Sequence, residues 1–163
     1  MAYAVTHILL VIIILDLLRH YVFKKEKFPR YLLVVGGIAG LVPDIDIIIS
    51  WVYNLFTGAS VSFHGTFTHS LIWPLLFLAI AGILHYQDKM KWAKIFYVIS
   101  FGLFFHLFLD CTFGGYKTFF WPYLTGNLCP QWGLQSQAQS IDAIILVLWL
   151  VHEEVHKKIR DYI

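Results

Sequence analysis

Five long apolar runs, separated by shorter polar stretches, dominate the chain. They cover residues 4–23, 31–56, 69–86, 95–113 and 141–156. Each approaches the roughly 20 residues that a helix needs to cross a hydrocarbon core about 30 Å thick. The pattern therefore predicts an all-α fold, a polytopic membrane helix bundle of about five transmembrane helices, in which residues 1–163 form a single domain.

The fourth run carries an ionisable pair, His106 and Asp110, inside an otherwise apolar sequence. Residues four apart share one face of a helix, so the imidazole and the carboxylate should lie side by side. Ionisable groups at membrane depth are costly, and they usually face the protein interior at a functional site. Because neutral imidazole and carboxylate suit Zn, Mn or Fe, metal ligation is the interpretation we favour.

The second run is interrupted at Pro43, which is followed at once by Asp44 and Asp46. Proline removes a backbone hydrogen bond, so this helix should kink or break there. Residues two apart on a regular helix point in nearly opposite directions, whereas a break allows both carboxylates to converge on one site. Irregular backbone at this depth is tolerated where protein or a water-filled cavity covers it.

Composition supports a membrane protein and sets its orientation. Hydrophobic residues make up 59% of the chain and charged residues 13%, against roughly 25% charged in soluble domains. The net charge of +2 gives no reason to expect nucleic acid as a partner, and membrane lipids are the expected surroundings. With alternating crossings, the basic residues gather on one face, which the positive-inside rule makes cytoplasmic. The N-terminus is then outside and the C-terminus inside; the residues that decide this are Arg19, Lys24, Lys25, Lys27, Arg30, Lys89, Lys91, Lys94, Lys157, Lys158 and Arg160, with Lys117 alone on the other face.

Counting at 1.5 Å per residue places the polar residues of four runs at one depth. From the cytoplasmic end of its run, Asp46 lies about 22 Å up, as does Asp110, while His7 lies about 24 Å and His69 about 26 Å up. These ligand types therefore occupy one slab in the outer third of the membrane. Asp142, at the outer start of the fifth run, could join them.

The loop before the third run contributes His64 and His69, which five residues separate. If Thr66 or Thr68 caps the third helix, His69 belongs to its first turn and His64 reaches in from the loop. The remaining histidines, near the cytoplasmic face, are expected to be interfacial or solvated; they are His20, His85, His152 and His156. Asp16 is expected to pair with Arg19 and His20. The stretch 152–156 could bind a metal through its histidines and glutamates, but we prefer a solvated helix end.

Two features of the outer loops, 57–68 and 114–140, remain open. Their aromatic residues are typical of an interfacial belt, which we prefer to a substrate platform; they include Phe119, Phe120, Trp121, Tyr123 and Trp132. A disulfide between Cys111 and Cys129 is possible because both cysteines fall on the outer side, but two cysteines alone do not establish it.

Four blocks in order give the sequence a resemblance to the YdjM-like family of membrane-bound predicted metal-dependent hydrolases. They are Thr6-His7-Ile-Leu-Leu, Leu41-Val-Pro-Asp44-Ile-Asp46, Phe63-His64-Gly-Thr-Phe-Thr-His69-Ser70-Leu71, and His106-Leu-Phe-Leu-Asp110 followed by Trp121-Pro122. The resemblance implies a ligand set of His7, Asp44, Asp46, His64, His69, His106 and Asp110. The chain departs from the family at Ile47, often a histidine, and at Gly65, where an arginine often follows the first loop histidine. More distantly, the order of ligands is similar to the zinc-dependent phospholipase C and P1 nuclease superfamily, whose members cleave phosphate esters.

We therefore expect a metal-dependent hydrolase that holds one or two divalent ions, zinc first and manganese or iron as alternatives. Catalytic roles are expected for Asp44, Asp46 and His69, with a carboxylate bridging two ions or acting as general base. A site at headgroup depth suggests a lipid phosphoester or lipid-linked phosphate as substrate. Two alternatives remain: a divalent-ion or proton transporter, which would need a second polar cluster in the inner half, and a non-catalytic protein with a structural metal.

Overall fold

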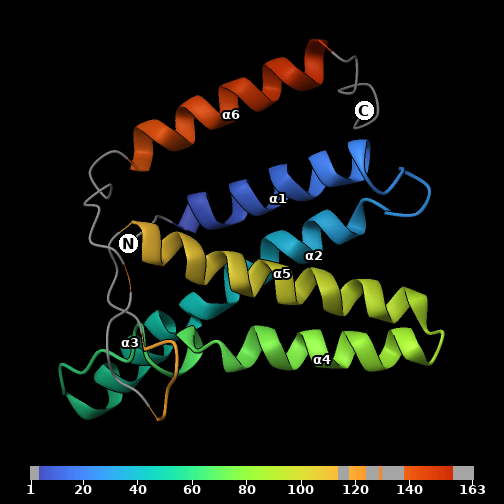
Figure 1. The fold of residues 1–163 in the computed structure, drawn as a ribbon. Coiled ribbons are helices and arrows are strands. Elements are labelled where there is room, and N and C mark those ends of the chain that lie inside the picture. The colour runs from blue at the N-terminus through green and yellow to red at the C-terminus, as the bar shows by residue number, and fades with distance from the viewer. Residues whose placement is uncertain (1–3, 114–117, 124–128, 130–137, 156–163) are drawn as a thin grey trace.

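The computed structural model describes residues 4–113, 118–123, 129 and 138–155, and every regular element within these ranges is a helix (Figure 1). Two of the helices are single 3₁₀ turns, labelled η. In chain order the elements are α1 (Ala4–Tyr21), α2 (Tyr31–Ala39), η1 (Val42–Asp44), α3 (Ile45–Thr57), η2 (Phe67–His69), α4 (Ile72–Tyr86), α5 (Met90–Thr112) and α6 (Ala138–Val155).

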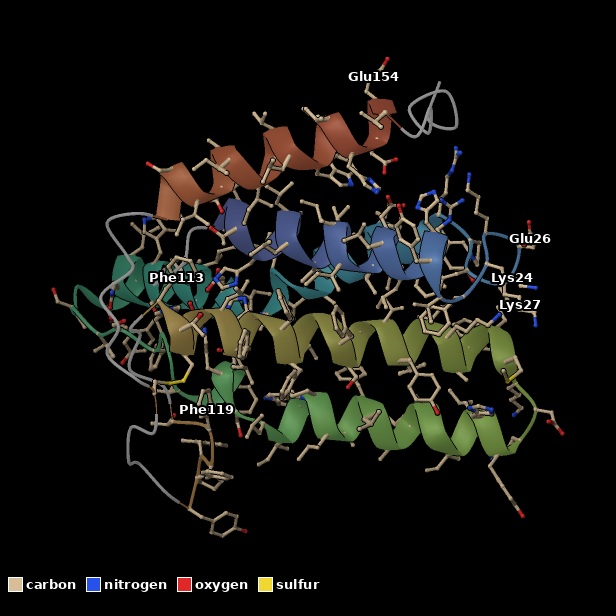
Figure 2. All side chains as sticks on the ribbon, turned by 45° about the horizontal axis from the view of Figure 1, so that its top comes forward. Lys24, Glu26, Lys27, Phe113, Phe119 and Glu154 are labelled. Atoms are coloured by element: carbon tan, nitrogen blue, oxygen red, sulfur yellow. A yellow bond between two sulfur atoms is a disulfide. The ribbon has the colours of Figure 1, made fainter. Side chains whose placement is uncertain are left out.

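Helices α1, α2, α4, α5 and α6 lie side by side, and each runs opposite to the one before it in the chain (Figure 1). One end of the bundle, here called the N-terminal end, holds the start of α1, both 3₁₀ turns and the end of α5. The opposite end, here called the basic end, holds Lys24, Glu26 and Lys27, far from Phe113 and Phe119 (Figure 2). There Lys94 Nζ donates to the carbonyl of Lys27 at 2.7 Å, so the two predicted basic loops do meet.

The predicted membrane helix bundle is confirmed, with shifted boundaries. Three helical stretches are long and apolar enough to cross a membrane, namely Ala4–Tyr21, Tyr31–Thr57 and Met90–Thr112, and α4 is a shorter apolar helix. Helix α5 begins at Met90 rather than residue 95, and α6 at Ala138 rather than residue 141. Helix α4 begins at Ile72, not at residue 69, because the chain first forms η2 and then extends through Ser70.

The predicted break at Pro43 is present, and it leaves one backbone carbonyl, that of Gly40, without its helical hydrogen bond. Helix α2 ends at Ala39, and the next turn is the 3₁₀ helix η1. In it the amide of Asp44 donates to the carbonyl of Leu41 at 3.1 Å. A continuous α-helix would instead direct that amide to Gly40, so the tighter turn leaves the Gly40 carbonyl available to another partner.

Glycines allow α1, α2 and α5 to approach closely around an apolar core. The core residues are Val11, Leu15, Phe28, Leu32, Leu33 and Val98. A Cβ at Gly102 of α5 would lie 2.8 Å from the carbonyl oxygen of Gly36 and 3.0 Å from the amide nitrogen of Gly40. Both neighbours are backbone atoms of the α2 segment, so α5 can pack here only through a residue without a side chain.

We predict that Gly102→Ala lowers stability by about 1–3 kcal/mol, because the added methyl forces α5 away from α2. The matched control is Gly82→Ala on α4, where an added Cβ meets nothing within 4 Å. That variant should be neutral or slightly stabilising, since alanine is the better helix former. Thermal unfolding of both variants in detergent measures the difference, and equal midpoints would contradict the packing argument.

Candidate metal centre

All seven sequence-predicted ligands meet at the N-terminal end of the bundle. His7 comes from α1, Asp44 from η1, Asp46 from α3, His69 from η2, and both His106 and Asp110 from α5, while His64 comes from the loop before η2. Five of them are almost fully buried, and Asp44 and His64 are partly exposed. Counting depth along the sequence therefore identified residues that converge in space.

The imidazole of His106 is oriented by the backbone break. Its Nδ1 lies 2.7 Å from the carbonyl oxygen of Gly40. A carbonyl can only accept, so Nδ1 must carry the hydrogen and the neutral ring keeps its lone pair on Nε2. A hydrogen bond of this kind on the second nitrogen is typical of metal-binding histidines.

The imidazole of His69 is held in the same tautomer by Asp46. Its Nδ1 lies 3.0 Å from Asp46 Oδ2, and the carboxylate can only accept. Asp46 also accepts from three other groups: His64 Nδ1 at 2.9 Å, Thr68 Oγ1 at 2.6 Å and the amide of Gly65 at 3.2 Å. Its two oxygens thus receive four donors, an arrangement that suits a positioning carboxylate; whether Asp46 also binds metal stays a prediction.

Four candidate ligand atoms lie near one another between η1, η2 and α5. His69 Nε2 and His106 Nε2 are 3.1 Å apart, and Asp110 Oδ2 lies 3.3 Å from each of them. Asp44 Oδ1 lies 3.6 Å from His106 Nε2 and 3.8 Å from His69 Nε2. Tetrahedral zinc with ligands at about 2.0–2.1 Å separates its ligand atoms by roughly 3.3–3.4 Å. The three atoms of His69, His106 and Asp110 fit such an ion, and Asp44 Oδ1 lies slightly farther from the two imidazoles.

Electrostatics also favour a cation among these atoms. With Nδ1 protonated in both rings, the lone pairs of His69 Nε2 and His106 Nε2 face each other beside the carboxylate of Asp110. Lone pairs at hydrogen-bond distance repel unless a positive charge lies between them, and the low dielectric of a buried site strengthens that repulsion. A metal ion or a bound proton would remove it.

His7 extends the set toward α1. Its ring stacks on that of His106, with centroids 3.8 Å apart, and its Nε2 lies 3.4 Å from Asp110 Oδ1. Neither ring nitrogen has a hydrogen-bond partner of good geometry in the described part of the chain. Of the described residues here, six form two groups whose donor atoms lie within 4.8 Å of one another: His7 with His106 and Asp110, and Asp44 with His64 and His69. Two adjacent groups are compatible with the expected one or two ions.

Within the described part of the chain, the exposed members of the cluster are Asp44 and His64. The side chains of Asp44 and His64 keep 16% and 11% of their surface exposed, whereas that of Asp46 keeps 3% and those of His69 and His106 none. Beside Asp46 lies a cavity of about 190 Å³, lined by Asp46, Ile49, Phe63, Thr66, Phe67 and Thr68. The centre therefore has a closed inner side and an open edge at Asp44 and His64.

The expected threonine cap is absent, and His69 is not in the first turn of α4. Neither Thr66 at η2 nor Leu71 at α4 makes a side-chain capping bond. Thr66 donates to the carbonyl of Phe63, and Thr68 donates to Asp46. The hydroxyl of Thr68 was missed as a site residue because a sequence does not show whether a threonine caps a helix or binds a nearby carboxylate.

Asp142 docks α6 onto α1 one residue from His7. Its Oδ2 accepts a hydrogen bond from Thr6 Oγ1 at 2.7 Å, and both side chains are largely buried. This contact assigns Asp142 a packing role beside the cluster, and its membership of the ligand set stays a prediction.

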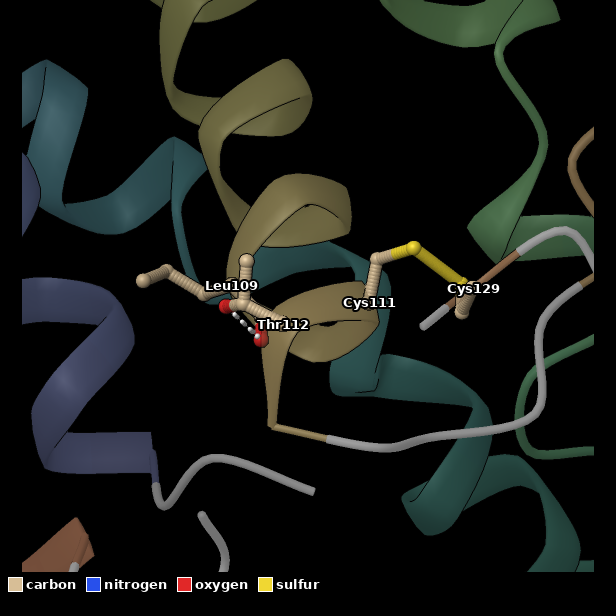
Figure 3. Close-up of a disulfide and its surroundings, with 4 residues drawn as sticks. All are labelled: Leu109, Cys111, Thr112 and Cys129. Atoms are coloured by element: carbon tan, nitrogen blue, oxygen red, sulfur yellow. Dashed lines mark hydrogen bonds between the residues drawn. A yellow bond between two sulfur atoms is a disulfide. The ribbon is translucent and has the colours of Figure 1, made fainter. Parts of the chain in front are cut away.

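A disulfide and a loop segment lie next to residues of the site. Cys111, next to Asp110, is bonded to Cys129 (Figure 3), which settles the pairing that the sequence left open. The amide and hydroxyl of Thr118 donate to the carbonyl of Gly65, and the amide of Leu71 donates to that of Phe119. The outer aromatic segment thus packs along the histidine loop; Lys117 and Trp132 lie outside the described residues.

The expectation for the basic end is wrong for Glu153 and for His20, whose side chain is 2% exposed instead of interfacial or solvated. Glu153, predicted to be on a solvated helix end, is 1% exposed and packs toward Asp16 and His20 of α1. Asp16 does pair with Arg19 and His20, at 3.7 and 3.2 Å, and His85 is exposed, as expected. Position 156 lies outside the described residues. A one-residue rotation of α6 decides which of two adjacent glutamates is buried, and sequence alone does not fix it.

Fold and site together define an integral membrane protein with a buried histidine and aspartate cluster of metal-ligand geometry. The profile of the family described as "YdjM inner membrane protein" matches residues 1–161, and the chain belongs to that family. No curated protein and no solved structure matches the chain.

We predict that His106→Ala and Asp110→Asn each bind at least one equivalent of zinc fewer than the wild type, because each removes a donor from the four-atom set. Elemental analysis of detergent-purified protein, with any affinity tag removed, measures this. The control is His85→Ala. This histidine lies at the basic end, where its Nδ1 is 3.2 Å from the Tyr97 hydroxyl. Equal metal content in all variants would contradict the site.

Asp46→Asn should weaken zinc binding by about 10–100-fold without abolishing it, because His69 loses the carboxylate that fixes its ring. Competition with a zinc chelator measures the affinity. Complete loss of the ion, as in Asp110→Asn, would instead make Asp46 a direct ligand.

Proposed function

We propose that this inner membrane protein is a metal-dependent hydrolase whose substrate is a phosphoester of a lipid or lipid-linked molecule. The observation that carries the proposal is the open edge of the cluster. Structural zinc sites are closed by four protein ligands, whereas catalytic sites leave a position for water or substrate. Here two of the candidate ligands, Asp44 and His64, are those that remain exposed.

Some residues of the cluster would bind an ion, and others orient the side chains that bind it. His69, His106, Asp110 and Asp44 would hold a single ion, zinc by ligand type and spacing. Two ions would divide the ligands into His7, His106 and Asp110 for one and Asp44, His64 and His69 for the other. A metal bound there would lower the pKa of a water and polarise the scissile phosphoryl oxygen. Asp46 fixes the rings of His64 and His69, and Asp44 is placed to accept a proton from water at the open edge.

The surroundings of the open edge favour a lipid substrate. Asp44 directly precedes α3 and Asp46 lies in its first turn. The apolar side chains Ile45, Ile48 and Trp51 of α3 are about half or more exposed. In a bilayer that face would touch lipid. An acyl or isoprenoid chain could remain beside α3 while its phosphate reaches the cavity lined by Thr66 and Thr68.

A transporter is supported by one observation and opposed by another. We expected a transporter to show a second polar cluster in the inner half, and Asp16, His20 and Glu153 form one. However, the core between the two clusters is apolar and closely packed: Val11 and Leu32 are 0% exposed, and Leu15 and Val98 3%. These core residues are all apolar and give an ion no polar path between the two clusters, so hydrolysis remains our preferred function.

We infer that the N-terminal end of the bundle faces outward and the basic end faces the cytoplasm. Lysine and arginine on the loop 22–30 and the turn before α5 favour the cytoplasm for the basic end. The Cys111–Cys129 disulfide supports the same orientation, because disulfides persist in the oxidising compartment outside the inner membrane and rarely in the cytosol.

We predict that zinc-loaded protein in mixed micelles releases phosphate or a phosphorylated headgroup from diacylglycerol phosphoesters or isoprenyl phosphates. Asp110→Asn should reduce the rate by more than roughly 100-fold, because losing a metal ligand costs more than losing a residue that only orients a ligand. His85→Ala should retain the wild-type rate. Protein that holds its zinc but cleaves none of these substrates would favour a non-catalytic metal protein.

For the orientation, alkaline phosphatase fused after the last residue should be inactive, and a fluorescent reporter at the same position should fold and fluoresce. The reason is that the C-terminus follows α6, which runs parallel to α1 toward the basic end (Figure 1). The opposite reporter pattern would invert the topology.

A further inference from the structure

A second cluster of buried polar groups lies at the basic end, between α1 and α6. Asp16 and His20 come from α1, and Glu153 comes from α6. One donor atom from each lies within 4.8 Å of the other two. Asp16 lies nine residues beyond His7, about 13 Å along the helix axis, so this cluster is separate from the first.

The members of this cluster are buried as deeply as those of the first. Asp16 is 0% exposed, Glu153 1%, and the side chain of His20 2%. Carboxylates are almost never buried to this extent without a cationic partner, because the loss of hydration costs several kcal/mol. The cluster therefore needs compensating charge.

His20, like His106, has one ring nitrogen that carries no hydrogen. Its Nδ1 lies 2.9 Å from the carbonyl of Asp16, and 3.2 Å from Oδ1 of the same residue. Both oxygens accept, so Nδ1 carries the hydrogen and the lone pair is on Nε2. Neither His20 Nε2 nor Glu153 Oε2 has a hydrogen-bond partner in the described part of the chain, although both atoms are buried.

Arg19 and His152 contact the two carboxylates of the cluster. Arg19 lies 3.7 Å from Asp16 Oδ1, and its Nε donates to the carbonyl of Phe28. His152 Nδ1 lies 3.0 Å from Glu153 Oε1, while its Nε2 lies 2.7 Å from the Tyr21 hydroxyl.

We propose that Asp16, His20 and Glu153 form a second divalent-metal site, which links α1 to α6 at the basic end. One imidazole and two carboxylates are a donor set that suits Zn²⁺, Mn²⁺ or Fe²⁺. The ion supplies positive charge beside two buried carboxylates and a partner for His20 Nε2 and Glu153 Oε2. Because the ligands come from two helices, its binding fixes α6 on α1. The proposal does not depend on hydrolytic activity at the other end.

The experiment compares two adjacent glutamates of α6. Glu153 is buried in the cluster, whereas Glu154 is exposed and points away from the bundle (Figure 2). Full-length, tag-free wild type, Glu153→Gln and Glu154→Gln are dialysed against Zn²⁺, and bound zinc is measured by elemental analysis. We expect Glu153→Gln to bind one equivalent less than both other proteins. In the Asp110→Asn background, the zinc that remains should disappear when Glu153→Gln is added.

Stability provides a second readout. Both glutamate variants are combined with Asp110→Asn for this measurement. Zinc should raise the thermal midpoint of the Glu154→Gln double variant and should not raise that of the Glu153→Gln double variant. If Glu153→Gln does not fold, His20→Gln replaces it with the same expected losses. Equal zinc content in the Glu153 and Glu154 variants, or loss of an equivalent in both, would overturn the site.

Discussion

The hydrogen bond from His106 Nδ1 to the Gly40 carbonyl connects the backbone of α2 to the chemistry of the first cluster. It exists because Pro43 ends the α-helix and the following 3₁₀ turn redirects the amide of Asp44 to Leu41. The carbonyl that loses its helical partner would be costly if left buried and unpaired. His106 satisfies it, and in doing so the ring is forced to present Nε2 to His69 and Asp110. A single proline thus fixes both the path of the chain and the tautomer of a ligand.

Close packing makes that bond possible. Gly102 lies one turn before His106 on α5, and its missing side chain lets α5 rest against the backbone of Gly36 and Gly40. A methyl group there would move the imidazole away from the carbonyl it must reach. The glycines of α2 and α5 are therefore part of the site, although none of them carries a functional group. This dependence also explains why the site and the apolar core of Val11, Leu15 and Val98 are continuous.

The sequence predicts the helices, the break and the seven converging residues, because each depends on local spacing: a period of 3.6 residues, 1.5 Å of rise and one proline. It does not predict which of those residues orient the others. Asp46 is engaged by Thr68 and by the amide of Gly65, whose φ of 81° turns the loop back toward α3. That loop conformation is set by tertiary contacts with Thr118. Nor does the sequence predict the burial of Glu153, which depends on how α6 is rotated against α1, and the flanking histidines and glutamates are equally typical of a solvated helix end.

The two clusters use the same local device in different surroundings, and the difference suggests different roles. In each, a backbone carbonyl accepts a hydrogen bond from Nδ1 of a histidine, so Nε2 keeps the lone pair that can bind a metal. The carbonyl is that of Gly40 for His106 and that of Asp16 for His20. At the N-terminal end Asp44 and His64 remain exposed, so water or a phosphate oxygen can approach. At the basic end Asp16, His20 and Glu153 are all buried, and Arg19 already offsets part of their charge. An ion held there would have no position open to a substrate, which suits a cross-link between helices, and the chemistry belongs to the open end.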